Sequence, residues 1–298
     1  MWKLELRSHG WCWVSSSNCS LASSSWLHPL KGESLRKRRG GSQERLGSMP
    51  NNRRLRDGEH ASPSSKGNRW ASDAYPDRYR DDVNASIGFA GVDMDMFTRG
   101  KVEDLVKLID RVARMPASRA ECLDIGCGVG VMHPMLHGKV ARLSGVDVSE
   151  DAVRDASSAH PQVNYEVQRN DRLPFADASF DVCSTVCVMH HVPPAQWRHF
   201  VAEAYRVTRP GGLFAVYEHN PINPLTRVAV WRCPFDHDAV LLRAGQTKAL
   251  LREAGFEIAE TRYLFFTPVD AAWARRVDGF LGWLPLGAQY VVCARKPG

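Results

Sequence analysis

The 298-residue sequence has no run of 18 apolar residues, and this absence excludes a conventional membrane-spanning helix. No segment recurs at a period of 20–50 residues, so a solenoid or propeller built from repeats is not expected. The hydrophobic fraction of 44% and the charged fraction of 24% are those of globular proteins. They exclude collagen-like, coiled-coil and wholly disordered chains.

The cysteines lack the spacing of a structural zinc site, because none of the eight is paired as C-x-x-C. Several of them lie in apolar, strand-like runs, where a thiol behaves as a small hydrophobic group. We therefore expect free thiols in a reducing compartment, and a cytoplasmic protein.

Basic charge is scarce in most of the chain, although the formal net charge is +6. Residues 1–80 hold 15 Lys/Arg and 7 Asp/Glu, a balance of +8, whereas residues 81–298 hold 24 and 26, a balance of −2. A domain that grips nucleic acid should itself carry a basic face, so nucleic acid is not an expected partner.

Residues 1–70 show no sustained apolar period and predict a disordered leader, so residues 71–298 form the expected single domain. One interpretation is a transit peptide, because residues 1–50 are rich in Arg and Ser and contain three Glu and no Asp. The location would then be mitochondrial. The favoured interpretation is an over-extended translation start, with Met49 as the true initiator.

From residue 120 onward the chain alternates strand-like and helix-like segments, which is typical of an α/β fold with a parallel sheet. A helix is expected before them, over Asp93–Met115. The expected strands are 122–125, 141–148, 163–167, 180–188, 212–217, 257–266 and 289–294. The expected helices between them are 131–137, 150–158, 195–207 and 246–254. Such a sheet binds its ligands at the carboxyl ends of the strands.

The first strand runs into Gly126-Cys127-Gly128-Val129-Gly130, which has the spacing G-x-G-x-G. Glycines there allow a tight turn and a close approach of the backbone to a ligand. The dinucleotide fingerprint G-x-G-x-x-G would need its third glycine where Val131 stands, which disfavours a nicotinamide dehydrogenase. Asp124, beside the loop, suits a positively charged ligand group better than a pyrophosphate.

Three more signals follow the next strands. Asp147 ends the second strand, 21 residues after Gly126, where a carboxylate can accept both hydroxyls of a ribose. Asp171 follows the third strand, where it could accept from the amine of an adenine or simply form a turn. The fourth strand leads into Met189-His190-His191.

In this order and spacing, the four signals resemble the class I S-adenosylmethionine-dependent methyltransferases, specifically the small-molecule branch with the ubiquinone and menaquinone methyltransferases. The resemblance covers roughly residues 95–296 and includes the turn Arg209-Pro210-Gly211-Gly212. It implies a Rossmann-like, doubly wound seven-stranded sheet whose last strand is antiparallel, with an N-terminal helix and a cap insertion.

The resemblance also implies S-adenosylmethionine as the cofactor, and it assigns the residues that bind it. They are Asp124, Gly126, Cys127, Gly128 and Gly130 for the methionine end, Asp147 for the ribose, Val148, Asp171 and Arg172 for the adenine, and Val188 for the sulfonium side.

An oxygen or nitrogen acceptor must lose a proton as it is methylated, and histidine is suited to take it at neutral pH. The first candidate is His219, after the fifth strand, and the second is His191, after the fourth. A structural hydrogen bond is the alternative for each. No metal is expected, because the carboxylates show no ligand spacing around His190, His191, His219 and His237.

Aromatic residues are dense in 218–245 and 262–287, which favours a small apolar or aromatic acceptor, such as a quinone, polyketide or lipid. An ordinary core under a cap is the alternative. Residues 271–286 combine apolar side chains with Arg275 and Arg276, so a peripheral membrane contact and a core-facing segment are both open. The sequence carries no sign of an oligomeric state.

The chief rival is a nucleic-acid or protein methyltransferase. It is disfavoured because the Asn/Asp-Pro-Pro-Tyr tetrapeptide of base amino-methyltransferases is absent after the fourth strand. A non-catalytic protein that keeps the cofactor fold is the other alternative.

Overall fold

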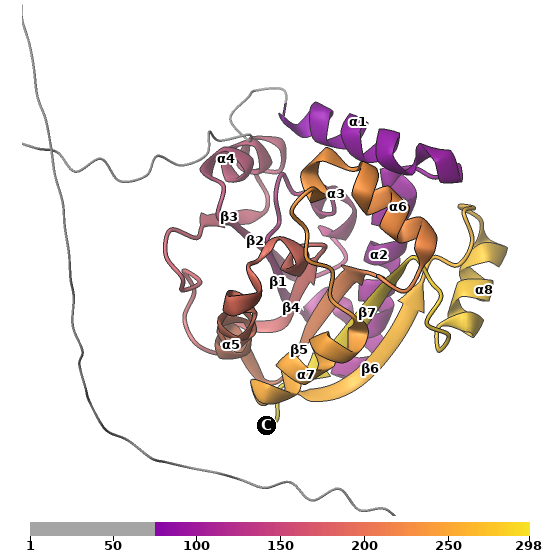
Figure 1. The fold of residues 1–298 in the computed structure, drawn as a ribbon. Coiled ribbons are helices and arrows are strands. Elements are labelled where there is room, and N and C mark those ends of the chain that lie inside the picture. Colours follow the sequence, from indigo (N-terminus) through magenta and orange to yellow (C-terminus); the bar gives the residue numbers. More distant parts are fainter. Residues whose placement is uncertain (1–74) are drawn as a thin grey trace, which may run out of the picture. The chain divides into compact units, whose positions relative to one another are not determined.

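The computed structural model describes residues 75–298 (Figure 1). The predicted leader, with Cys12 and Cys19, lies outside the described residues, and the domain boundary at residue 71 stays a prediction. The six cysteines of the described part of the chain are all free thiols, as expected.

A seven-stranded sheet forms the centre of the domain, in the order β3-β2-β1-β4-β5-β7-β6. Only β7 is antiparallel to its neighbours, β5 and β6, so the predicted topology is confirmed. The strand bounds are β1 Glu121–Ile125, β2 Arg142–Asp147, β3 Asn164–Val167, β4 Phe180–Val186, β5 Thr208–His219, β6 Glu257–Leu264 and β7 Gln289–Arg295.

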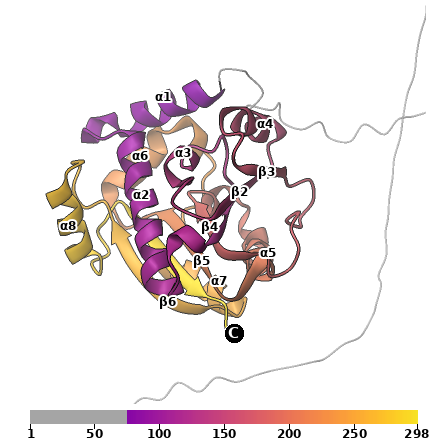
Figure 2. The same cartoon turned by 180° about the vertical axis from the view of Figure 1, so that it is seen from behind.

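Helices cover both faces of this sheet (Figures 1 and 2). One face packs against α2 (Met94–Leu108) and α3 (His133–Leu136), and the other packs against α5 (Trp197–Val207) and α7 (Ala244–Glu253). In β5, alternate side chains serve the two faces: Tyr217 belongs to the first core and Val216 to the second. Helix α4 (Glu150–Ala159) packs on β2 and β3.

Helix α2 is fixed to the sheet by a buried polar network. The Tyr217 hydroxyl donates to Asp104 Oδ2 at 2.9 Å, and the guanidinium of Arg262 pairs with the other oxygen of Asp104. Gly100 fits against Phe265, because a Cβ at that glycine would lie 2.5 Å from the ring. The helix thus has one position over the sheet, and it ends at Leu108 in a π-helical turn rather than running on to Met115.

Two further helices lie beyond the carboxyl ends of the strands. Helix α6 (Pro224–Arg232) is the predicted cap insertion, and Asn223 caps its first turn by accepting from the N–H groups of Leu225 and Thr226. Helix α1 (Tyr75–Ile87) lies beside it (Figure 1). The Arg232 guanidinium is 5.7 Å from the centroid of the Phe89 ring, just after α1.

The core-facing interpretation of residues 271–286 holds for only one side of the segment. In α8 (Ala272–Leu281), Trp273 is 56% exposed and Phe280 is 78% exposed, and Trp283 behind the helix is also exposed. This helix packs on β6 through other side chains, since Ala274 is buried. Among residues 75–298, none of the helices combines the length and hydropathy needed to cross a bilayer.

Candidate functional site

The glycine loop after β1 has the backbone that its sequence predicts. Gly126, Gly128 and Gly130 have φ values of +77°, +53° and +72°, in the left-handed region that favours glycine. The N–H groups of Gly126 and Cys127 both donate to the carbonyl of Val146, at 2.8 and 3.1 Å. The loop is therefore held against the carboxyl end of β2.

The three glycines of the loop meet different surroundings. A Cβ on Gly126 would lie 2.6 Å from the methyl groups of Val188, and one on Gly130 would lie 2.5 Å from the Tyr165 hydroxyl oxygen. A Cβ on Gly128 would meet no atom within 4 Å. Gly130 therefore serves packing, whereas Gly128 faces open space.

Asp147 lies at the tip of β2 and points at this loop. Its Oδ2 accepts from the Gly128 N–H at 2.8 Å and its Oδ1 accepts from the Ser149 N–H at 2.9 Å. Burial raises the pKa of this carboxyl group, although the two backbone hydrogen bonds oppose the rise. The next side chain, Val148, is apolar and yet 74% exposed.

Asp124 has partners within the protein. Its Oδ2 is 3.2 Å from Nε2 of the fully buried His133, and its Oδ1 accepts from the Ser184 hydroxyl at 3.3 Å. His133 also hydrogen-bonds the Tyr165 hydroxyl through Nδ1. This buried chain orients the carboxylate, and the sequence analysis did not find it.

Asp171 and Arg172 are exposed and separate from the other predicted site residues. The backbone carbonyl of Asp171 accepts from His199 Nε2 at 2.6 Å, and the Arg172 guanidinium is 3.4 Å from a carboxylate oxygen of Asp177.

One cavity of about 1240 Å³ joins most of the predicted residues. It begins at the glycine loop, Asp147 and Val148, and it continues between α2 and α6 to His191 and His219. Gly130, Asp171 and Arg172 do not line it. Because these walls come from the ends of β1, β2, β4 and β5, the cavity lies where an open α/β sheet binds its ligands.

Comparison with known proteins agrees with this geometry. Residues 123–216 match the methyltransferase domain family. The chain is 30% identical over 154 residues to an uncharacterised methyltransferase of Synechocystis, covering 50% of this chain and 72% of the relative. It is 30% identical over 210 residues to a 27-O-demethylrifamycin SV methyltransferase of Amycolatopsis mediterranei, covering 65% and 75%.

The chain belongs to the S-adenosylmethionine-dependent methyltransferases. It is also 28% identical over 187 residues to a ubiquinone biosynthesis O-methyltransferase of Thiobacillus denitrificans, covering 57% of this chain and 79% of the relative. The cofactor of this family is S-adenosylmethionine, as the sequence resemblance implied.

Each of the two predicted base candidates lies beside a polar side chain. His219 lines the cavity and is a neighbour of the Cys187 side chain. Burial lowers its pKa, but the neighbouring sulfur outweighs burial and raises it overall. His191 Nε2 is 3.4 Å from Asp236 Oδ1, and burial together with the charge of His190 lowers its pKa to about 4.

His190 is buried between two carboxylates. Its Nδ1 is 2.6 Å from Glu218 Oε2, and its Nε2 is 3.5 Å from Asp236 Oδ1. Burial acts to lower the pKa of the imidazole. The two carboxylates have the larger effect, and they raise the pKa well above its usual value. Groups of His190, His191 and Asp236 lie within 4.8 Å of one another. The contacts of His190 with its two carboxylates account for most of this cluster, and the absence of a metal stays a prediction.

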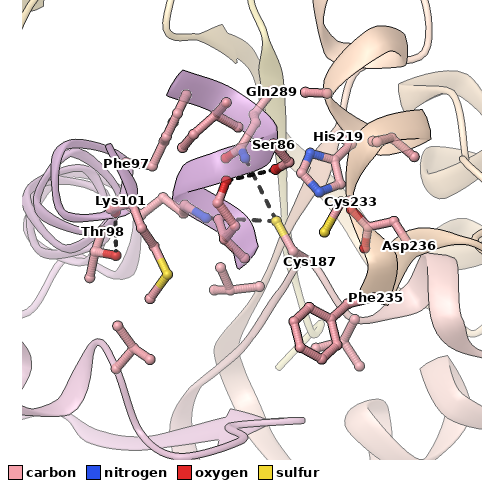
Figure 3. A pocket seen from close by; sticks show the side chains of 18 of the residues that line it. Ser86, Phe97, Thr98, Lys101, Cys187, His219, Cys233, Phe235, Asp236 and Gln289 are labelled. Atoms are coloured by element: carbon pink, nitrogen blue, oxygen red, sulfur yellow. Dashed lines mark hydrogen bonds between the residues drawn. The ribbon is translucent and has the colours of Figure 1, made fainter. Parts of the chain in front are cut away.

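The sequence analysis missed three polar residues at the far end of the cavity (Figure 3). Lys101 comes from α2, Cys187 follows β4, and Gln289 begins β7. Lys101 Nζ donates to Cys187 Sγ at 3.6 Å, and Gln289 Nε2 donates to the same sulfur at 3.8 Å. The position of Cys187 near the carboxyl end of the expected strand 180–188, at the edge where the ligands bind, was the one signal that could have found it.

Proposed function

We propose that this methyltransferase transfers a methyl group from S-adenosylmethionine to an oxygen, nitrogen or carbon atom of a small, apolar or aromatic acceptor. The observation that carries the proposal is the continuous cavity that joins the glycine loop to the polar group around Cys187. Its volume of about 1240 Å³ exceeds the roughly 300–1,000 Å³ of a typical small-molecule pocket. It therefore has room for two molecules side by side.

The residues at the loop end fit the cofactor. Asp147 uses one lone pair of each carboxylate oxygen on a backbone N–H, and about two lone pairs remain for the ribose hydroxyls. Val148 offers an exposed apolar side chain to the adenine, and Gly128 leaves space for the methionine end. When bound, the cofactor supplies a methyl group on a positively charged sulfur.

The remaining assignments rest on the sequence resemblance together with this placement. Asp124, Gly126 and Cys127 line the cavity beside Gly128, and Val188 lies against Gly126. Gly130 supports the loop through its packing on Tyr165. The roles of Asp171 and Arg172 at the adenine stay predictions.

The acceptor class is supported by the walls of the other half of the cavity. Five phenylalanine rings contribute to them: Phe89, Phe97, Phe235, Phe265 and Phe266. Relatives named for a ubiquinone pathway and for 27-O-demethylrifamycin SV agree with an apolar organic acceptor. Contact with a membrane surface stays a prediction, supported by the exposed Trp273, Phe280 and Trp283.

Two measurements on the full chain test the proposal. Calorimetry with S-adenosylmethionine and S-adenosylhomocysteine should show saturable binding, and no heat at millimolar ligand would refute the cofactor assignment. A methyl-transfer assay against quinols, phenols and lipids, read by product mass, should yield a methylated product. A product from nucleic acid or protein alone would refute the acceptor class.

A further inference from the structure

Two hydrogen-bond donors converge on the sulfur of Cys187 in the acceptor half of the cavity. They are the ammonium of Lys101 and the amide nitrogen of Gln289, and the imidazole of His219 is a further neighbour of the thiol (Figure 3). Lys101 is only 8% exposed, and within residues 75–298 no carboxylate pairs with it. A buried ammonium is costly unless an anion lies beside it, so this surrounding favours the thiolate form of Cys187.

The other cysteines of the described chain show how unusual this thiol is. Burial raises the pKa of Cys233, which lines the same cavity, to about 11, and that of Cys183 to about 12. Burial also acts on Cys187, but the charges of Lys101 and His219 outweigh it and lower the pKa of the thiol to about 7. At neutral pH a substantial fraction of Cys187 is thus ionised, whereas Cys183 and Cys233 are protonated.

The backbone also presents this sulfur to the cavity. Cys187 has φ +57°, in the left-handed region that a non-glycine residue seldom adopts. Its N–H donates to the carbonyl of Tyr217 at 2.8 Å, which holds the strained turn in place at the end of β4. Strain of this kind is concentrated at functional sites.

A second observation indicates that a ligand binds here. Gln289 is 5% exposed, and its Oε1 has no hydrogen-bond partner among the described residues. Because the amide nitrogen is directed to Cys187, the oxygen is left to accept from something in the cavity. A buried acceptor left unpaired costs about 1–3 kcal/mol, which a hydroxyl or N–H group of a bound molecule would recover.

We propose that Cys187 Sγ takes the proton from a phenolic or enolic hydroxyl of the methyl acceptor, and that Lys101 stabilises the oxygen anion that remains. This inference rests on the proposed function and deepens it. The O–H bond breaks, an S–H bond forms, and the negative charge moves from sulfur to oxygen. The oxygen anion would then bind the methyl group as the bond from that methyl to the sulfonium sulfur breaks and S-adenosylhomocysteine leaves, and the thiol would lose its proton to solvent before the next turnover.

The histidines cannot take this proton as readily. His219 faces the sulfur of Cys187, whose charge raises the pKa of the imidazole, and His191 is a weak base that faces Asp236. His219 is therefore a positioning residue that keeps Cys187 ionised. The titratable and charged groups around Cys187 are Lys101 on α2, Glu218 and His219 on β5, His190 after β4 and Tyr290 on β7.

The basicity of the sulfur selects the acceptor. A phenol has a pKa of about 10, so its proton moves to a thiolate of pKa about 7 against a roughly 10³-fold unfavourable equilibrium. An aliphatic hydroxyl is about as weakly acidic as water, with a pKa near 15.7, and faces a factor of roughly 10⁹. Lys101 stabilises the phenolate and so reduces the pKa difference between a phenol and the thiol. The pKa difference between an aliphatic hydroxyl and the thiol stays too large, so alcohols should not be methylated.

The first test measures the ionisation of the Cys187 thiol without any methyl transfer. The full chain is alkylated with iodoacetamide between pH 5 and 10, and each cysteine peptide is quantified by mass. Cys187 should react with a midpoint near pH 7, with Cys233 as the control in the same cavity. Lys101→Met should slow Cys187 by about fivefold or more at pH 7, and Lys107→Met, outside the cavity on the same helix, should not. A midpoint near that of an ordinary thiol would overturn the inference.

The second test measures the oxygen anion that Lys101 is proposed to stabilise. 4-Nitrophenol, whose ionised form absorbs visible light, is titrated onto the chain with S-adenosylhomocysteine present at pH 6. The wild type and Lys107→Met should increase the ionised fraction, while Lys101→Met should not. Cys187→Ser should increase it at least as much as the wild type, because the proton can leave to the buffer and no thiolate then competes for Lys101. An equal ionised fraction in Lys101→Met and wild type would also overturn the inference.

Turnover separates this inference from the proposed function. Phenol should be methylated and benzyl alcohol should not, and Cys187→Ser should move the acidic limb of the kcat–pH profile. Transfer to phenols with an unchanged profile in Cys187→Ser would overturn the role of Cys187 alone. Absence of cofactor binding would overturn the proposed function, while the alkylation result would stand independently.

Discussion

Replacing Gly128 by alanine should separate the cofactor site from the folding of its loop. Gly128 has φ +53°, and a Cβ there would contact nothing within 4 Å. An alanine in this left-handed region costs about 1–2 kcal/mol, of which 0.4–1 kcal/mol is offset by the smaller entropy of the unfolded chain. The free energy of unfolding should fall by about 1 kcal/mol, which lowers the Tm by about 2–4 °C for a domain of this size.

The chain offers a matched control at Gly138. It has φ +82° and open space around its missing Cβ, and it does not line the cavity. Gly138→Ala should therefore cost as much stability as Gly128→Ala. Only Gly128→Ala places a methyl group in the space proposed for the methionine end, so it alone should weaken cofactor binding by tenfold or more, about 1.4 kcal/mol.

Thermal unfolding and calorimetry with S-adenosylhomocysteine measure the two effects separately. Gly126→Ala extends the series, because its Cβ would overlap the methyl groups of Val188 at 2.6 Å and should destabilise the fold more strongly. Wild-type affinity in a folded Gly128→Ala protein would refute the placement of the cofactor. Equal weakening in Gly138→Ala would show that loop strain, rather than occupied space, sets the affinity.

The remaining predictions concern single side chains. Asp147→Ala should weaken binding of S-adenosylhomocysteine in calorimetry by at least tenfold, about 1.4 kcal/mol, and unchanged affinity would contradict the ribose assignment. His219→Ala should lower kcat more than cofactor affinity, because its imidazole stabilises the thiolate of Cys187; the reverse pattern would assign it to the cofactor. Raising the pH through about 7 should accelerate alkylation of Cys187 but not of Cys233, whose pKa is about 11. Tyr217→Phe should lower the free energy of unfolding by about 1.5–3 kcal/mol through the lost hydrogen bond to a buried carboxylate, and an unchanged Tm would contradict that role.

The sheet could be predicted because each of its strands and helices has a local sequence pattern, an apolar run bounded by turn residues. The left-handed glycines of the loop after β1 and the carboxylate of Asp147 were likewise visible as residue types at a fixed spacing. Helix α1 was not expected, because its segment is polar and its position depends on contact with α2 and α6. The helix is stabilised by its tertiary contacts, and hydrophobic periodicity within the segment does not reveal such contacts.

Cys187 shows why the chemistry was harder to predict than the fold. In the sequence it continues the apolar strand β4, where a cysteine is expected to be an inert hydrophobic group. What changes it is a left-handed turn, two donors that come from α2 and β7, 86 and 102 residues away, and the charge of His219 on β5. The base candidates His191 and His219 were easier to find in the sequence, but in the structure each of them lies against a polar neighbour.

The charges at this end of the cavity also explain how a proton could move there at low cost. Lys101 brings one positive charge into a place with no carboxylate partner among the described residues, so one negative charge beside it is favourable. Before proton transfer that charge is on Cys187, and afterwards it is on the oxygen of the acceptor. Because the ammonium faces an anion in both states, the protein needs little rearrangement between them, which is the condition under which fixed charges assist a reaction most.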